Sequence, residues 1–340
     1  MPRYSYGGQA LIEGVLMRGR NAVAVAFRHP DGRIVWASEQ LNTGPHGWRF
    51  ARAPGIRGLV VLYETLVVGT RWLIRGANLQ AADGEEGAEL GKGSIALMLG
   101  LTLVIGAGVF FIVPLLLAQA ATGNSGSWVQ HLIEGAVKVV LFLGYLGLIS
   151  RAPDIQRVFQ YHGAEHMTIH ALEAGESLTT TNVRQHPTAH PRCGTEFLVV
   201  LVALSIVAFA LVGKQPPLVG VASRIILIPV LAAVGYELLR LGARYRANPV
   251  VRAVMWPGML VQKITTKRPT DDMIEVAIVS MEQALIADGE SVPAGSADFE
   301  QRPMRLEPAP AVDTTAQTAP PAPTAIPPVQ TVPTDPPPGR

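Results

Sequence analysis

The residues best suited to chemistry lie in one short stretch, Tyr161-His162-Gly163-Ala164-Glu165-His166. If this stretch is helical, His162, Glu165 and His166 fall within an arc of about 100° on one face. Two imidazoles on one face can chelate one divalent metal, and the neighbouring carboxylate can act as a general base. The order His-x-x-Glu-His is that of inverted zinc peptidases. The stretch therefore predicts a zinc-type site, with His162 and His166 as ligands and Glu165 as the catalytic residue.

A helix from about Pro153 to Glu173 is expected to carry this stretch, because proline and an early aspartate suit a first turn. On such a helix His170 lies about 12 Å along the axis from His162, and Glu173 about 16 Å. Both are too distant to bind the same ion. The other ligands must come from another segment.

The nearest supply of ligands is the turn His186-Pro-Thr-Ala-His190-Pro-Arg-Cys193-Gly-Thr195. Imidazole and thiolate are good zinc ligands, and a short spacing in a constrained turn brings them together. A different arrangement would use Glu237 as the third ligand, as inverted zinc peptidases use a downstream glutamate. Two other readings stay open: Cys193 as a nucleophile with His190 as its base, or Cys193 as a small buried apolar side chain.

The composition indicates a membrane protein. Of 340 residues, 49% are hydrophobic and only 16% are charged, below the usual quarter, and the mean hydropathy is +0.28. The net charge of +2 comes without a basic patch interleaved with aromatic residues, so we expect no nucleic-acid partner. A single cysteine excludes an intrachain disulfide and suits a reducing compartment. Because the N-terminus lacks an apolar core of the needed length, we expect no signal peptide.

Four apolar segments predict two transmembrane hairpins in the lipid bilayer, since about 20 apolar residues cross a membrane. They are residues 95–121, 128–149, 197–213 and 218–239. Pro114 is expected to kink the first. Glu134 and Lys138, four residues apart in the second, are expected to pair, with a transport role as the weaker alternative. Arg224, near the start of the fourth, can reach the interface.

Lysine and arginine counts predict the orientation. Residues 1–93 hold 11 of them, residues 151–193 hold 4 and residues 238–268 hold 7, whereas the two hairpin turns together hold 1. Because such residues accumulate on the cytoplasmic side, both termini and the histidine-rich connection are predicted to be cytoplasmic.

The remaining segments predict a cytoplasmic α+β part. Residues 21–37 suggest a β-hairpin, and residues 55–79 and 270–287 suggest amphipathic helices. The glycine-dense residues 7–19 suggest a buried strand, in which Glu13 and Arg18 pair; the alternative is that the backbone and Glu13 approach a ligand or the metal. From this we divide the chain into an N-terminal part (1–93), hairpin 1 (94–150), the histidine-rich connection (151–193), hairpin 2 (194–240), a surface segment and helix (241–290) and a disordered proline-rich tail (291–340).

Three motifs together, Gly7-Gly-Gln-Ala-Leu-Ile-Glu-Gly-Val-Leu-Met-Arg-Gly19, Tyr161-His-Gly-Ala-Glu-His166 and His190-Pro-Arg-Cys-Gly-Thr195, resemble the YqhQ-like family. This is a family of bacterial membrane proteins of unknown function, labelled predicted metal-dependent enzymes. The resemblance covers residues 5–288 and implies a bacterial cytoplasmic membrane, but no substrate. The family often has lysine where this chain has Met167, and serine where it has Glu196.

The sequence thus predicts a mainly α membrane protein that acts as a metal-dependent hydrolase, with a peptidase as one form of it. His162, His166 and either His190 or Cys193 would hold the metal. Alternatives from other classes are a membrane scaffold or assembly factor with a structural metal, and a transporter. Residues that could contribute further are Glu237, Glu13, Arg18, His170 and His186.

Overall fold

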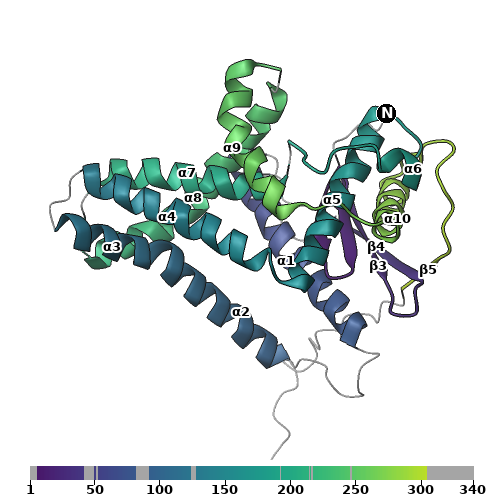
Figure 1. The fold of residues 1–340 in the computed structure, drawn as a ribbon, viewed down its shortest axis with the longest axis horizontal. Coiled ribbons are helices and arrows are strands. Elements are labelled where there is room, and N and C mark those ends of the chain that lie inside the picture. Colours follow the sequence, from purple (N-terminus) through teal and green to yellow (C-terminus); the bar gives the residue numbers. More distant parts are fainter. Residues whose placement is uncertain are drawn as a thin grey trace, which may run out of the picture. The chain divides into compact units, whose positions relative to one another are not determined.

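The computed structural model describes residues 6–41, 50, 53–81, 92–123, 128–191, 193–213, 215, 217–245 and 247–304. This part of the chain is mainly helical, with one small sheet (Figure 1). The predicted mainly α class with an α+β part is confirmed at that level. The fold matters for function because one helix beside the sheet carries the predicted metal ligands.

The sheet has five strands in the order β1-β2-β3-β4-β5. The first four, β1 (Gly7–Leu11), β2 (Gly14–Arg18), β3 (Ala22–Arg28) and β4 (Ile34–Gln40), pair antiparallel. The predicted hairpin is β3 and β4, in which Phe27 lies opposite Val35. The glycine-dense segment forms two strands instead of one. They turn at Ile12 and Glu13, where Glu13 has a φ of 51°.

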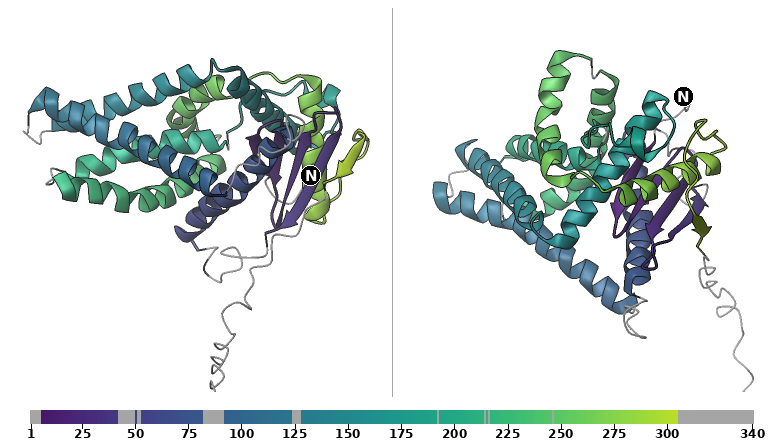
Figure 2. Two further views of the ribbon diagram at one scale, coloured as in Figure 1. Left: turned by 90° about the horizontal axis from the view of Figure 1, so that it is seen from below. Right: turned by 45° about the vertical axis from the view of Figure 1, so that its right-hand side comes forward.

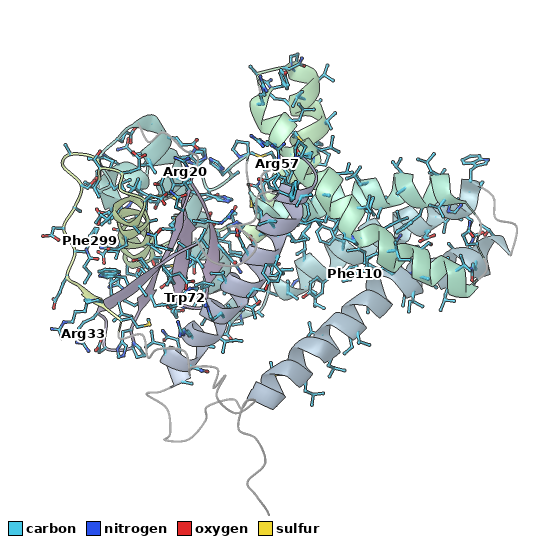
Figure 3. All side chains as sticks on the ribbon, turned by 180° about the vertical axis from the view of Figure 1, so that it is seen from behind. Arg20, Arg33, Arg57, Trp72, Phe110 and Phe299 are labelled. Carbon is cyan, nitrogen blue, oxygen red and sulfur yellow. The ribbon has the colours of Figure 1, made fainter. Side chains whose placement is uncertain are left out.

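Alternation along these strands gives the sheet two apolar faces. On one face Val15, Met17, Ala24 and Ala26 pack against α5 (Pro153–Ala174) and α10 (Asp271–Ala287). On the other, residues including Leu16, Val23, Val25 and Phe27 pack around Trp72 of α1 (Ile56–Ala81). Figure 2 shows the sheet from two further sides, and Figure 3 labels Trp72. The expected helices at 55–79, 153–173 and 270–287 are all present.

The fifth strand comes from the segment that we expected to belong to the disordered tail. β5 (Gln301–Pro303) pairs parallel with β4, so that Val35 lies opposite Arg302. Upstream, the Ala297 N–H donates to the Leu178 carbonyl at 3.0 Å, and Phe299 packs against the core. These contacts extend the folded part to Met304. Residues 305–340, the rest of the predicted tail, lie outside the described residues.

Within the described part of the chain, three helical stretches are long and apolar enough to cross a membrane: Gly100–Thr122, Trp128–Ile149 and Gly194–Val212. The first comprises the end of α2 (Lys92–Ala107), a π-helical turn (Gly108–Ile112) and α3 (Val113–Thr122). The π-helical turn ends two residues before Pro114, where we predicted a kink. The other two are α4 (Trp128–Ile149) and α7 (Gly194–Val212).

The fourth predicted span coincides with α8 (Pro217–Arg244), which contains Pro229. Helix α8 is not among the three stretches that satisfy the length and hydropathy criteria, and its role as a span stays a prediction. The expected surface segment after it contains α9 (Pro249–Thr265). A short helix, α6 (Thr180–Val183), lies in the histidine-rich connection.

The predicted pair inside the second apolar helix forms. Lys138 Nζ lies 2.9 Å from Glu134 Oε1, and both side chains are buried. Lys138 Nζ also lies 4.6 Å from the ring centroid of Phe209 on α7. Ion pairing and the aromatic face both stabilise a cation away from water. The pair thus helps to join α4 to α7.

Candidate metal centre

Helix α5 carries the His-x-x-Glu-His stretch at its centre. Pro153 occupies its first turn, and Gly175 ends it in the left-handed conformation with a φ of 75°. Midway along the helix, Gly163 lies against the Lys267 carbonyl, leaving no room for a side chain. This close approach brings the segment after α9 alongside the two histidines. The helix therefore presents a buried His166 and a partly buried His162.

Backbone carbonyls orient both imidazoles. His162 Nδ1 lies 2.9 Å from the Thr265 carbonyl, and His166 Nδ1 lies 2.6 Å from the Thr188 carbonyl. A carbonyl accepts only from an N–H, so each Nδ1 is protonated and each Nε2 keeps its lone pair. This is how metal-binding histidines are usually held. Burial lowers the pKa of His166 well below its usual value, which favours the neutral form that a metal requires.

Cys193 brings a thiol to the same place. Its Sγ lies 3.2 Å from His162 Nε2. One ligand atom from each of His162, His166 and Cys193 can be chosen so that all three lie within 4.8 Å of one another. Cys193 caps the N-terminus of α7, where the Thr195 N–H donates to the sulfur at 3.3 Å. Burial raises the pKa of the thiol, whereas a coordinated cation would deprotonate it.

Glu165 lies beside these ligands. Its carboxylate Oε2 is 4.0 Å from His162 Nε2, and the residue is only 3% exposed. The backbone N–H of Gly8, on β1, donates to the carboxylate. Burial is the largest influence on this group and raises its pKa to about 8, against the nearby His162, which lowers it. A carboxyl with that pKa can exchange a proton near neutral pH.

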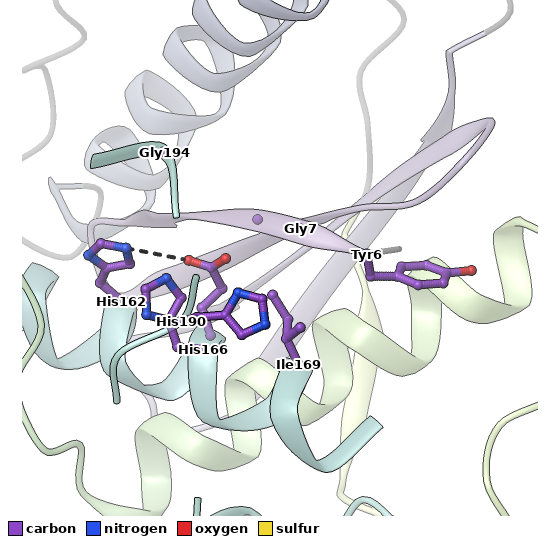
Figure 4. Close-up of a pocket in the computed structure, with 9 residues that line it drawn as sticks. Tyr6, Gly7, His162, His166, Ile169, His190 and Gly194 are labelled. Atoms are coloured by element: carbon purple, nitrogen blue, oxygen red, sulfur yellow. Dashed lines mark ion pairs between the residues drawn. The ribbon is translucent and has the colours of Figure 1, made fainter. Parts of the chain in front are cut away.

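A cavity of about 30 Å³ lies between α5 and the first strand. Figure 4 shows the imidazoles of His162, His166 and His190 beneath the strand that holds Gly7, and Glu165 also lines this cavity. Tyr6 also lines the cavity, but its ring points away, and its hydroxyl donates to Asp288 at 3.0 Å. About 10–15 Å³ suffices for one water, so the cavity can hold an ion and a small ligand.

His190 lines the cavity but joins a second group of donors. A ligand atom from each of His170, Glu173 and His190 can be chosen so that the three lie within 4.8 Å of one another. His190 Nε2 is 3.5 Å from Glu173 Oε2. We expected one or both of His190 and Cys193 to bind the same ion as His162 and His166; the structure brings Cys193 to those histidines and His190 to the next turns of α5. His186 stacks on His170, with ring centroids 6.0 Å apart.

Three acidic or basic candidates have partners elsewhere. Glu237 forms a bidentate pair with Arg57. Glu13 pairs with Arg157 on α5, with one contact of 2.6 Å, and accepts from the Tyr161 hydroxyl at 3.2 Å. The expected pairing of Glu13 with Arg18 is wrong because the tight turn moves Glu13 to α5. Arg18 pairs instead with the buried Glu64 of α1.

The site depends on several groups that the sequence did not reveal. The carbonyls of Thr265 and Thr188 orient the histidines, and the amide of Gly8 contacts the base. Backbone groups of any residue type can do this, so no pattern identifies them. Gln262 on α9 is fully buried and bonds both backbone groups of His190, at 2.9 and 3.0 Å. No pattern in the sequence indicates that this glutamine, in an apolar helix, bonds to His190.

The fold and site define a helical chain with apolar helices, a small sheet and a histidine-rich group that could hold a metal. Residues 53–287 match a family described as protein of unknown function (DUF1385). The chain is also 32% identical over 293 residues to the uncharacterized protein YqhQ of Bacillus subtilis (strain 168), covering 83% of this chain and 92% of that protein. The chain belongs to this family, as the three motifs predicted. No solved structure matches it.

Proposed function

We propose that the protein is a membrane-bound, metal-dependent hydrolase whose site opens towards the cytoplasm. The observation that carries this proposal is the convergence of one ligand atom each from His162, His166 and Cys193 beside the buried carboxylate of Glu165. Three protein ligands with one open position are typical of catalytic zinc sites, whereas structural sites have four. Two nitrogens and one sulfur favour zinc over magnesium or calcium.

Each side chain has one task in this proposal. His162 and His166 hold the ion, and the carbonyls of Thr265 and Thr188 fix the tautomers of their imidazoles. A bound divalent cation would supply a Lewis acid that polarises the bond to be cleaved and makes water more acidic. Glu165 takes the proton from the attacking water and returns it to the leaving group. The Gly8 amide keeps the carboxylate aimed into the cavity.

Membrane attachment is supported by the apolar surfaces of the helices. Large apolar side chains on the candidate spans point outward, including Val104 at 71% and Leu211 at 83% exposure. Soluble chains rarely expose such continuous apolar surface. The proposed partner of these helices is therefore the lipid bilayer. The cytoplasmic position of the site follows from the lysine and arginine distribution.

The proposal stops at hydrolase rather than peptidase. An inverted zinc peptidase would take a downstream glutamate as a ligand, but Glu237 is held by Arg57. Cys193 occupies the third ligand position instead. The sulfur ligand distinguishes the site from that of an inverted zinc peptidase. Glu165, the proposed base, still lies between the two histidines in the sequence.

The test is metal content and hydrolysis by the purified full chain in detergent. We expect stoichiometric zinc in the wild type, loss of one ion in His162→Ala, and full retention in Glu165→Gln. Ester, amide and phosphoester panels should then give a hydrolysis rate that Glu165→Gln lowers by about 10²–10⁴-fold, as for loss of a general base. No stoichiometric metal in the wild type would end the proposal. Metal binding with equal rates for wild type and Glu165→Gln would favour a scaffold with a structural metal.

A further inference from the structure

A second set of metal donors follows the first along α5. His170 and Glu173 lie one and two turns beyond His166, and His190 reaches them from the connection before α7. His190 Nε2 and Glu173 Oε2 are 3.5 Å apart. Ligands at about 2.0–2.2 Å around a tetrahedral ion stand about 3.4 Å from each other. The spacing of these two atoms is thus already that of neighbouring ligands.

Hydrogen bonds to other parts of the chain hold the two histidines of this group in place. His170 Nε2 lies 3.0 Å from the Ala189 carbonyl, so that nitrogen carries the proton and Nδ1 keeps its lone pair. The backbone of His190 is fixed at both its N–H and its carbonyl by Gln262. The His170 and His190 rings meet edge to face, with centroids 4.6 Å apart. Such fixed orientation is what holds a metal-binding imidazole ready.

We propose that His170, Glu173 and His190 form a second, independent divalent-cation site. Its two nitrogens and one oxygen suit zinc or a similar transition metal, without the sulfur that marks the first site. The centres of the two ligand pairs on α5 are about 11 Å apart along the helix at 1.5 Å per residue. Metals that share a reaction lie about 3.5–4 Å apart. We therefore assign the second ion no part in the same bond cleavage, although its ligand His190 approaches the first group, with its ring centroid 5.7 Å from that of His166.

The second site has a positioning role for the first. His190 is three residues before Cys193, and the two belong to different donor groups. An ion that ties His190 to α5 fixes the turn that delivers the thiol to His162 and His166. Filling the second site should strengthen binding at the first, because the turn is ordered in advance. This coupling rests on the proposed function, whereas the second site itself does not.

Cobalt titration of the full chain in detergent separates the two sites, because only the first has a thiolate. We expect two ions per chain in the wild type. His170→Ala and Glu173→Gln should each lose one ion and keep the thiolate-to-cobalt absorption. Cys193→Ser should lose that absorption and keep one ion. His186→Ala is the matched control, because His186 stacks on His170 outside the donor group, and it should keep both ions.

The outcomes distinguish the two proposals. A single ion that Cys193→Ser removes and His170→Ala leaves would overturn the second site and keep the first. A single ion that His170→Ala and Glu173→Gln remove, with no thiolate absorption in the wild type, would overturn the first site and keep the second. Loss of an ion from His186→Ala would overturn the three-residue assignment. Circular dichroism and gel filtration are used to check that each variant is folded before its bound ions are counted.

The coupling has its own readout. With the second site intact, the cobalt affinity measured from the thiolate absorption should exceed that of His170→Ala by about tenfold, a coupling of about 1.4 kcal/mol. Equal affinities would overturn the positioning role while leaving the count of ions unchanged.

Discussion

The Glu165 carboxylate occupies the space that the missing side chain of Gly8 leaves open. A Cβ on Gly8 would lie 2.9 Å from both Cγ and Oε1 of Glu165, and 2.5 Å from the Leu16 carbonyl. The Gly8 amide donates to the same carboxylate. The first strand of the protein thus fixes the proposed base on α5, 157 residues later in the chain.

Gly8→Ala should therefore displace Glu165 and strain the sheet. Because the Leu16 carbonyl is backbone and cannot rotate away, we expect a loss of about 1–3 kcal/mol, as for overpacking. Hydrolysis should fall by up to about 10²-fold, since a shift of about 1 Å can cost that much. Thermal unfolding and the substrate panel measure the two effects.

Gly7→Ala is the control for this substitution. A Cβ at Gly7 would meet nothing within 4 Å, although Gly7 lines the same cavity. We expect its unfolding temperature and hydrolysis to match the wild type. If Gly8→Ala behaved in the same way, the strand would not position the base.

Local patterns predicted most of the elements because local physics determines them. Alternation identified the β3–β4 hairpin, and the proline and early aspartate identified the start of α5. Two features escaped because they depend on distant contacts. The turn at Glu13 is stabilised by Arg157, and β5 exists only because β4 offers it an edge. Neither partner can be found from spacing along the chain.

The same division holds for the site. Helical spacing placed His162, Glu165 and His166 on one face, and the short turn supplied Cys193 as a candidate ligand. Which donor group His190 joins could not be predicted, because its position depends on Gln262, which bonds the backbone of the turn. The separation along α5 did exclude His170 from the first ion, which left it available to a second.

Removal of metal should lower the thermal stability. The first ion would connect α5 to the start of α7 through residues far apart in the chain. At a free ion concentration about 100 times Kd, binding contributes about 2.7 kcal/mol. We expect chelation to lower the unfolding temperature and zinc to restore it. His162→Ala should recover less than the wild type on adding zinc.

His29→Ala controls for the loss of any histidine. His29 pairs with Asp31 in the β3–β4 turn, away from both donor groups. Its response to chelation and zinc should equal that of the wild type. A response in His162→Ala as large as in His29→Ala would show that the first ion does not bind there.

The site should lie on the cytoplasmic side of the membrane. Green fluorescent protein fused after Met304 should fluoresce, whereas alkaline phosphatase inserted at Ser125, in the first hairpin turn, should be active. The reasons are the 11 lysine and arginine residues in 1–93 and their absence from 122–130. In the reciprocal fusions, active phosphatase at both points would contradict the three spans predicted between Ser125 and Met304, and active phosphatase after Met304 alone would invert the orientation.

The stability of the sheet region should depend on pH through Glu282 of α10. Glu282 is only 6% exposed, and burial, helped by the charge of Asp298, raises its pKa from the usual 4.5 to about 7. The folded state therefore binds this proton more tightly than the unfolded state does. The contribution of Glu282 to stability is fully present below pH 4.5 and is lost as pH rises to about 7.

Glu282→Gln should remove this dependence, because glutamine stays neutral throughout. Relative to the wild type, the variant should be more stable at pH 8, by on the order of 1–3 kcal/mol, and equal at pH 4.5. Glu275→Gln is the matched control on the same helix, since Glu275 pairs with Arg28 at 2.9 Å and its loss should cost at most about 1 kcal/mol. Unfolding temperatures from pH 4.5 to 8 give both curves. A constant difference between Glu282→Gln and the wild type would show that Glu282 does not change its charge in this range.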